Sequence, residues 1–242
     1  MNSNQLNRPL FSIRNIHKFF GYKQVLKGIN LEFSENQVTL LVGKNGAGKS
    51  TLVKILTGLM RPTEGNVNFR GENIQNQAEI YRKAIGVITH DILFYGDLTA
   101  RENLRFFGKL RSIENLDKEI QKALKDTGLQ KATDMPVKTF SSGMCKRLNI
   151  ARLMLSGPKI LFLDEPYSGL DFDSIALLNE YIAQIKQNGG AILLISHQVD
   201  ACFDYIDRAA YLINGEISRL VPKSELNQTD LPGKFHVSDG IN

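Results

Sequence analysis

Residues 43–50, GKNGAGKS, contain three glycines, two lysines and a serine, and they match the spacing GxxxxGK[ST]. Glycines allow backbone N–H groups to surround phosphate oxygens, and the lysine of this pattern reaches the β- and γ-phosphates. The run follows VTLLV at 38–42 and precedes an apolar helical pattern, which is the context that a phosphate loop requires. A glycine-rich turn before a helix is the alternative interpretation. The predicted phosphate-contacting residues are Gly43, Lys44, Asn45, Gly46, Ala47, Gly48, Lys49, Ser50 and Thr51.

Two acidic residues, Asp164 and Glu165, end a second apolar run, KILFLDEP at 159–166. A carboxylate beside a phosphate loop can hold Mg²⁺, and a second carboxylate can orient or deprotonate an attacking water. We therefore predict that Asp164 and the Ser50 hydroxyl bind Mg²⁺ and that Glu165 is a general base. Two solvated acids in a strand-to-loop turn are the alternative interpretation of the pair.

A second glycine-containing segment, FSSGM at 140–144, precedes an amphipathic helical pattern, KRLNIARLML. No Asp or Glu occurs from residue 135 to residue 163, so Ser141, Ser142 and Gly143 lie in a positively charged stretch. A helix N-terminus in such a stretch can bind an anion. An ordinary serine cap is the alternative.

The elements that must position these residues are apolar runs at 38–42, 84–88, 160–163 and 191–195. Strands that are apolar throughout are typical of a parallel sheet covered on both faces, which predicts an α/β core. VNFRGENI around Gly71 and AAYLINGEISRL around Asn214 predict flanking antiparallel strands. Apolar residues at spacings near 3.6 predict a helical subdomain over about 91–155, and the polar segment 221–242 is expected to be a loosely ordered tail.

Length and composition exclude several classes of protein. A chain of 242 residues is long enough to bury its own core, as one large domain or two small ones. Two isolated cysteines predict neither a disulfide framework nor a structural zinc site. No apolar run approaches the ~18–20 residues of a membrane helix, and the N-terminus lacks a signal-peptide pattern, so we expect a cytoplasmic protein. The net charge of +5 is spread along the chain and does not require a nucleic acid partner.

From Leu10 to Leu220 the chain resembles the ATP-binding subunit of an ABC transporter. Phe20, which lies 29 positions before Lys49, resembles the aromatic residue that stacks on adenine in that family. FSSGM resembles the family signature LSGGQ, with Ser142 in place of the first glycine and Met144 in place of the glutamine. SGLD at 168–171 resembles the loop that communicates between two subunits, and His197 resembles the switch histidine that contacts the γ-phosphate. Without the family resemblance, the alternative interpretations are that Phe20 is a core aromatic, that His197 caps a strand end and that Asp171 caps a helix.

The resemblance implies a P-loop NTPase core with a parallel sheet, an antiparallel β subdomain and a helical subdomain, occupying residues 10–220. It also implies ATP and Mg²⁺ as ligands, a head-to-tail homodimer, and a polytopic membrane permease that holds the chain at the inner face of the cell membrane. The implied catalytic residues are Glu165, His197 and Lys49. The implied nucleotide contacts outside the phosphate loop are Phe20, His90, Ser141, Ser142, Gly143 and Asp171.

His90 stands where this family usually has a glutamine, at the end of the run IGVIT. The segment HDILFYGDLTARENLRFF around it resembles, within the family, the ATPase subunit of the haem exporters of cytochrome c maturation. That resemblance implies haem export. An exporter of a lipid, drug or polysaccharide is the alternative cargo class, and a soluble ATPase acting on ribosomes or DNA, or a regulator that does not hydrolyse ATP, are alternative functions.

Overall fold

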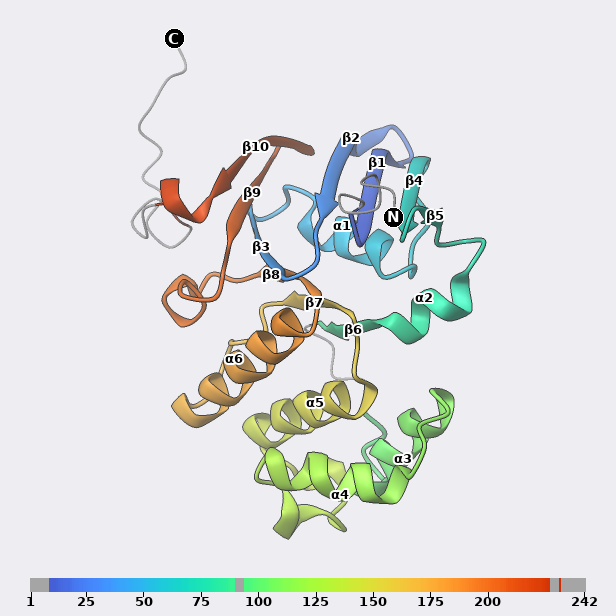
Figure 1. The fold of residues 1–242 in the computed structure, drawn as a ribbon, viewed down its shortest axis with the longest axis vertical. Helices are drawn as coiled ribbons and strands as arrows, with labels where there is room; N and C mark the ends of the chain where they lie inside the picture. The colour runs from blue at the N-terminus through green and yellow to red at the C-terminus, as the bar shows by residue number, and fades with distance from the viewer. Residues whose placement is uncertain (1–8, 90–93, 227–230, 232–242) are drawn as a thin grey trace, which may run out of the picture.

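The computed structural model describes residues 9–89, 94–226 and 231, and its largest element is a six-stranded sheet in the order β10-β9-β3-β8-β7-β6 (Figure 1). Strands β9, β3, β8, β7 and β6 are parallel to their neighbours, and only β10 pairs antiparallel. All four predicted apolar runs are parallel strands of this sheet. The strands are β3 (Gln37–Val42), β6 (Ile85–Ile88), β7 (Ile160–Asp164), β8 (Ala191–Ile195), β9 (Arg208–Ile213) and β10 (Glu216–Pro222).

The central strands are apolar throughout because each face of the sheet packs on a different core. Phe162 of β7 packs in a cluster with helix α1 (Lys49–Leu56), whereas its neighbours Leu161 and Leu163 pack in a second cluster with helix α6 (Phe172–Gln187). Alternation of side chains along a strand sends successive residues to opposite faces. Both faces of the sheet therefore exclude water, as the uninterrupted apolar runs predict.

A second sheet is antiparallel, with strand order β2-β1-β4-β5, and shares the α1 cluster. Phe11 of β1 joins the layers, because its ring stacks on that of Tyr81 at 5.9 Å and meets the edge of Phe162 at 5.7 Å between ring centroids. This sheet is the predicted antiparallel subdomain. Its elements are β1 (Phe11–Phe20), β2 (Lys23–Phe33), β4 (Glu64–Phe69) and β5 (Glu72–Asn73), followed by helix α2 (Ala78–Ala84).

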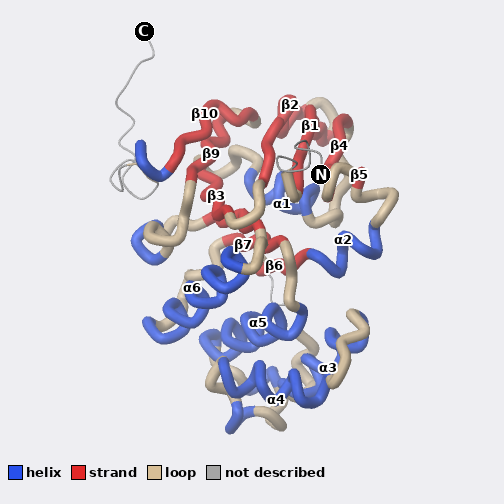
Figure 2. The backbone as a smooth tube through the Cα atoms, in the orientation of Figure 1, coloured by secondary structure: helices blue, strands red, loops and turns tan. Residues whose placement is uncertain are grey.

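The helical subdomain forms the lower layer in Figure 2 and has its own core. Leu104, Leu124 and Leu148 come from its three helices and are buried together. Thr99 begins the first of these helices with a capping box, since its side chain accepts from the Glu102 N–H and the Glu102 carboxylate accepts from the Thr99 N–H. The helices are α3 (Ala100–Leu110), α4 (Leu116–Asp126) and α5 (Ser142–Ser156).

Helix α3 does not bury its whole apolar stripe. Leu104 is fully buried, but Leu110, one of the periodic residues that predicted the helix, is 66% exposed. Phe107 between them is only partly buried. The apolar pattern predicts the helix correctly, and its C-terminal end presents apolar surface to solvent.

The hairpin around Asn214 and Gly215 joins β9 to β10 and has positive φ at both residues, as the Asn-Gly pair predicts.

The predicted domain end at Leu220 is too early. Strand β10 continues to Pro222, and Leu226 and Leu231 are buried against the α6 cluster. The short 3₁₀ helices are η1 (Gln130–Ala132), η2 (Val137–Thr139), η3 (Val199–Ala201) and η4 (Lys223–Glu225).

The architecture agrees with the predicted α/β core, antiparallel β subdomain and helical subdomain. The long strands β1 and β2 were not delineated by periodicity, because three register shifts interrupt their pairing and so their side-chain alternation. Within the described ranges, no helix has both the length and the apolarity needed to cross a bilayer.

Replacing the α3 cap, Thr99→Ala, should lower the free energy of unfolding by about 1 kcal/mol, because it removes the acceptor of the Glu102 N–H. Urea denaturation followed by circular dichroism would report this as a lower midpoint. Lys118→Ala, on the exposed face of α4, is the control and should leave the midpoint unchanged. Equal midpoints for Thr99→Ala and the parent would contradict the assigned role of the cap.

Candidate active site

The phosphate-loop sequence connects β3 to helix α1, as predicted. The Lys49 ammonium group donates to the carbonyl oxygens of Gly43, at 2.6 Å, and Lys44, at 3.2 Å, and so lies across the loop. Helix α1 begins at Lys49 without an acidic residue in its first turn, so no negative side chain there neutralises the positive end of its dipole. A lysine, a helix N-terminus and a glycine-rich backbone together form an anion-binding site.

Two glycines let neighbouring strands press directly on this loop. Gly48 has φ +108°, and a Cβ there would lie 2.7 Å from Cδ2 of Leu26 on β2. A Cβ on Gly43 would lie 2.5 Å from the carbonyl oxygen of Leu212 on β9. Larger residues at either position would displace a strand, so the loop conformation depends on both glycines.

Asp164 ends strand β7, and its Oδ2 accepts from the Ser50 hydroxyl at 3.4 Å. A hydroxyl and one carboxylate fit Mg²⁺, which protein sites hold with few side chains while phosphate and water supply the remaining ligands. The described part of the chain contains no group of three or more His, Cys, Asp or Glu residues placed to hold a metal.

Glu165 adopts φ 51°, an uncommon conformation for a residue with a side chain. Its N–H donates to the carbonyl oxygen of Ile195 at 2.9 Å, and its Oε2 accepts from the His197 N–H at 3.1 Å. The turn after β7 is thereby tied to the end of β8. These contacts direct the Glu165 carboxylate toward the histidine.

The other carboxylate oxygen, Glu165 Oε1, is buried and makes no hydrogen bond with any described residue. His197 Nε2 lies 3.4 Å from it, and the imidazole is half exposed. The imidazole thus faces Glu165, whereas a strand-end cap would face the backbone. A buried carboxylate oxygen without a donor is costly, and it is free to accept a proton from a water.

Lys49 shares its electrostatic environment with both carboxylates. Burial lowers the pKa of Lys49, and attraction to Glu165 and Asp164 opposes that shift. The structure therefore brings together five predicted residues at the carboxyl edge of β3, β8 and β7: Lys49, Ser50, Asp164, Glu165 and His197.

Phe20 ends strand β1 and is 48% exposed, so it is not the core aromatic that its alternative interpretation required. The Lys18 ammonium group lies 5.3 Å from the centre of the Phe20 ring. Because β2 packs against Gly48, the β1–β2 hairpin that carries Phe20 is anchored at the phosphate loop. The exposed ring is available for stacking.

Ser141 is the N-cap of helix α5, and its hydroxyl accepts from the Met144 N–H at 3.2 Å. Ser141 and Ser142 are exposed. Among the described residues, no hydrogen bond or ion pair joins Ser141, Ser142 or Gly143 to loop 43–50. The second anion-binding segment thus faces solvent in the single chain.

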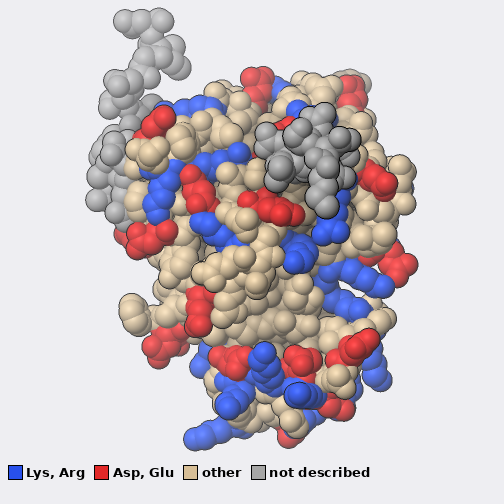
Figure 3. Space-filling model, in the orientation of Figure 1, with Lys and Arg blue, Asp and Glu red and all other residues tan. Residues whose placement is uncertain are grey.

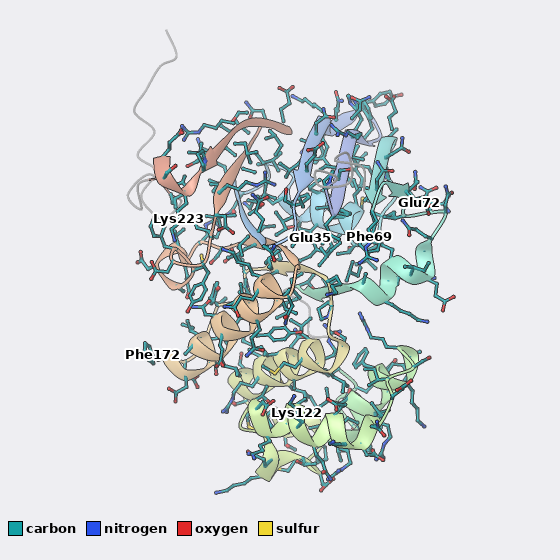
Figure 4. All side chains as sticks on the ribbon, viewed as in Figure 1. Glu35, Phe69, Glu72, Lys122, Phe172 and Lys223 are labelled. Atoms are coloured by element: carbon teal, nitrogen blue, oxygen red, sulfur yellow. The ribbon has the colours of Figure 1, made fainter. Side chains whose placement is uncertain are left out.

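Asp171 is the N-cap of α6, as its cap interpretation predicted, and its Oδ1 accepts from the Ser174 N–H at 2.9 Å. Hydrogen bonds from Ser174 hold the pKa of the Asp171 carboxyl below its usual range. The next residue, Phe172, is 84% exposed and points away from the body of the molecule (Figure 4). This loop also faces solvent in the single chain.

His90 lies outside the described residues. Its predecessor Thr89 lines a small cavity of about 50 Å³ beside Glu165, together with Lys146 and Asn149 of α5. Sequence reasoning did not single out these three residues. Asn149 is buried among the apolar residues of α5. A polar residue within an apolar helical pattern is the one sequence signal that could have indicated it.

Known proteins share both the sequence and the fold of this chain. The sequence model of the family described as "ABC transporter" matches residues 26–168. The ABC transporter ATP-binding protein YdbJ of Bacillus subtilis (strain 168) is 34% identical, over 91% of this chain and 72% of its own. The linearmycin resistance ATP-binding protein LnrL of the same organism is 31% identical, over 90% of this chain and 70% of its own. The lantibiotic transport ATP-binding protein SrtF of Streptococcus pyogenes is 34% identical, over 86% of this chain and 89% of its own.

Solved structures agree with these relatives. An ATP-binding subunit of an ABC transporter superposes with a TM-score of 0.83 at 26% identity, over 91% of each chain. The dimeric structure of MJ0796, a bacterial ABC transporter cassette, superposes with a TM-score of 0.77 at 25% identity, over 88% of this chain and 98% of its own. The chain belongs to the ABC transporter family, as an ATP-binding subunit that hydrolyses ATP.

Proposed function

We propose that this chain hydrolyses ATP to drive a separate polytopic membrane subunit, and that Glu165 is the general base. The observation that carries the assignment of the base is Glu165 Oε1, a buried carboxylate oxygen without a hydrogen-bond donor beside the phosphate loop. An oxygen in that state can accept the proton of an attacking water. The backbone N–H of His197 holds the other oxygen and fixes the carboxylate.

Each remaining residue of the site has one task in this proposal. Lys49 binds the β- and γ-phosphate oxygens. These contacts replace the hydrogen bonds that its ammonium group makes with the loop carbonyls. Ser50 and Asp164 would hold Mg²⁺, which would supply charge neutralisation at the phosphates. The His197 imidazole, half exposed beside Glu165, donates to the γ-phosphate. Phe20 stacks on the adenine.

We also propose that two copies of the chain form a head-to-tail homodimer. The signature segment around Ser141 and the loop around Asp171 face solvent in one chain, which leaves both free to meet the phosphate loop of a second copy. The positive stretch of α5 would then close over the ATP phosphates. MJ0796, which has this fold, is described as dimeric.

The membrane partner places the chain, in this proposal, at the inner face of the cell membrane. For the cargo, the reported relatives are named for linearmycin resistance and lantibiotic transport. These names favour export of a compound of the drug class, one of the alternative cargoes, over haem. Haem export for cytochrome c biogenesis rests on the sequence resemblance around His90 alone, and none of the relatives reported above carries that name. Purifying the complex and measuring ATPase stimulation by haem, by an amphiphilic peptide and by a lipid distinguishes these cargoes.

Glu165→Gln should reduce steady-state ATP turnover by ~100-fold or more and leave ATP binding intact, because an amide cannot accept the proton but can still accept from the His197 N–H. Hydrolysis assays, equilibrium ATP binding and size-exclusion chromatography with ATP would measure this, with accumulation of an ATP-bound dimer expected. Glu35→Gln, at an exposed glutamate between β2 and β3, is the matched control. Normal turnover in Glu165→Gln would remove this residue from the role of base.

Phe20→Ala should weaken ATP binding by roughly tenfold to a hundredfold, since base stacking on an aromatic ring is worth about 1–3 kcal/mol. The Mg²⁺ dependence should stay unchanged, because the ring does not contact the metal residues. Tyr22→Ala is the control, as Tyr22 lies two positions away on the same hairpin and is fully exposed. If both variants bind ATP as the parent does, the stacking assignment is wrong.

A further inference from the structure

The small cavity of about 50 Å³ beside Glu165 lies between the end of β6, helix α5 and the loop that leads to α6. We call it the base cavity and define it by its polar lining residues, which are Thr89, Lys146, Asn149, Glu165 and Ser168. Among the described residues that line it, none belongs to loop 43–50, and neither Asp164 nor His197 is one of them. The base cavity is therefore separate from the site assigned to the phosphates and Mg²⁺.

The polar side chains around the base cavity lack hydrogen-bond partners among the described residues. Asn149 is only 7% exposed, yet its carboxamide makes no hydrogen bond within this part of the chain. Glu165 Oε1 is also buried and unpaired, because His197 Nε2, at 3.4 Å, does not complete a hydrogen bond with it. Buried amide and carboxylate groups in proteins are nearly always hydrogen-bonded, since an unpaired one is costly.

Lys146 adds an unpaired positive charge. Its Nζ would lie 2.8 Å from a Cβ on Gly169, so the ammonium group lies directly over the loop that leads to α6. Lys146 is partly buried and makes no hydrogen bond or ion pair with any described residue. Figure 3 shows other Lys and Arg side chains of the helical subdomain at the surface, intermingled with Asp and Glu. Lys146 differs from them because it lines a cavity.

Helix α5 carries both of these residues on one face. Lys146 and Asn149 are three positions apart, a spacing that makes side chains neighbours on a helix. The residues on either side of Asn149, Leu148 and Ile150, are buried in apolar clusters. A polar side chain at this point in the helix thus has no acceptor or donor in the surrounding core.

The unpaired groups are chemically complementary. Lys146 and Asn149 supply N–H donors, and Glu165 Oε1 supplies an acceptor. No hydrogen bond or ion pair joins Glu165 to Lys146 or Asn149 directly, so their pairing requires something between them. A cavity of this volume has room for water, and a buried water is held by about two to four polar groups, as this lining provides.

We propose that the base cavity holds water between α5 and Glu165, and that Lys146 and Asn149 are positioning residues that act on Glu165 Oε1 through this water. The inference rests on the proposed function, because it takes Glu165 as the general base. A carboxylate oxygen can accept two hydrogen bonds, so cavity water leaves room for the attacking water. The carboxylate is then held at both oxygens, by the His197 N–H at Oε2 and by cavity water at Oε1.

Variants of Asn149 test the proposal through kinetics of the full chain. Asn149→Leu removes the carboxamide at similar volume and should lower kcat by roughly tenfold while leaving the KM for ATP unchanged, because it acts on the base and not on the nucleotide. Asn149→Ser keeps a hydroxyl beside the water and should retain most of kcat. Equal kcat for Asn149→Leu and the parent would contradict the proposal.

Variants of Lys146 give an independent test if Asn149→Leu does not fold. Lys146→Met removes the ammonium group and should also lower kcat without changing the KM for ATP, whereas Lys146→Arg should retain most of kcat. Lys122→Met, at an exposed lysine of α4, is the matched control and should hydrolyse ATP as the parent does. A Lys146→Met variant with the parent's kcat would remove Lys146 from the proposed role.

The urea midpoint of unfolding separates a positioning role from a structural one. Asn149→Leu should keep or raise the midpoint, because an apolar side chain replaces a buried polar group that has no protein partner. Asn103→Leu is the contrasting control and should lower it, since the Asn103 carboxamide donates to the carbonyl oxygens of Tyr95, Leu98 and Thr99. If Asn149→Leu lowers both the midpoint and kcat, and Asn149→Ser does not restore kcat, Asn149 is structural and the inference is wrong.

Combining Asn149→Leu with Glu165→Gln distinguishes this inference from the proposed function. The double variant should turn over ATP as slowly as Glu165→Gln alone, because the base that Asn149 positions is already absent. A further loss of about tenfold would show that Asn149 acts elsewhere and would overturn the inference. Normal turnover in Glu165→Gln overturns the assignment of the base, whereas an inactive Glu165→Gln beside fully active Asn149→Leu and Lys146→Met overturns the inference alone.

A high-resolution crystal structure of the full chain tests the bridge directly. We expect ordered water within hydrogen-bond distance of Glu165 Oε1 and of Lys146 or Asn149, and loss of that water in Asn149→Leu. A dry cavity in the parent chain, or water that does not contact Oε1, would overturn the inference.

Discussion

The rest of the structure depends on one constraint: the anionic phosphates and an anionic base must share one site. Lys49 and the N-terminus of α1 supply positive charge at the loop, while Glu165 is held against the end of β8 by the His197 N–H. The pKa of Lys49 reflects this compromise, since burial lowers it and the two carboxylates oppose that effect. The glycines of the loop are needed because only backbone at close range brings enough N–H donors to the phosphates.

Strand order satisfies this constraint. Strand β8 lies between β3 and β7, so the phosphate loop, Glu165 and His197 leave the same edge of the sheet on three adjacent strands. Parallel strands buried on both faces cannot slide independently, because Phe162 and Leu161 anchor β7 in two separate cores. The α1 and α6 layers therefore fix the spacing of the site as well as the stability of the sheet.

Sequence patterns predicted the parts of this site better than its assembly. The apolar runs give strands β3, β6, β7 and β8, and Asn214-Gly215 gives a hairpin, because these are local signals. The contact between Glu165 and His197 joins residues 32 positions apart and requires the strand order, which does not follow the chain. Strands β1 and β2 escaped detection because irregular pairing obscures their alternation. The hydrogen bonds of Arg111 and Arg152 to carbonyls of β6 were equally hidden, since helical spacing does not indicate which strand a helix contacts.

Strand β6 connects the helical subdomain to the hydrolytic site. Thr89, the residue that follows β6, lines both a cavity of about 620 Å³ between the core and the helical subdomain and the small cavity beside Glu165. Ile88 pairs with Leu163, one position before Asp164, so β6 and the carboxylate turn share a continuous hydrogen-bonded register. Arg111 and Arg152 bind carbonyls of Ile85 and Val87 on the same short strand. The same short strand therefore carries the contacts of the helical subdomain on its carbonyls and pairs with the strand that ends at the carboxylates, which fixes the subdomain relative to Glu165.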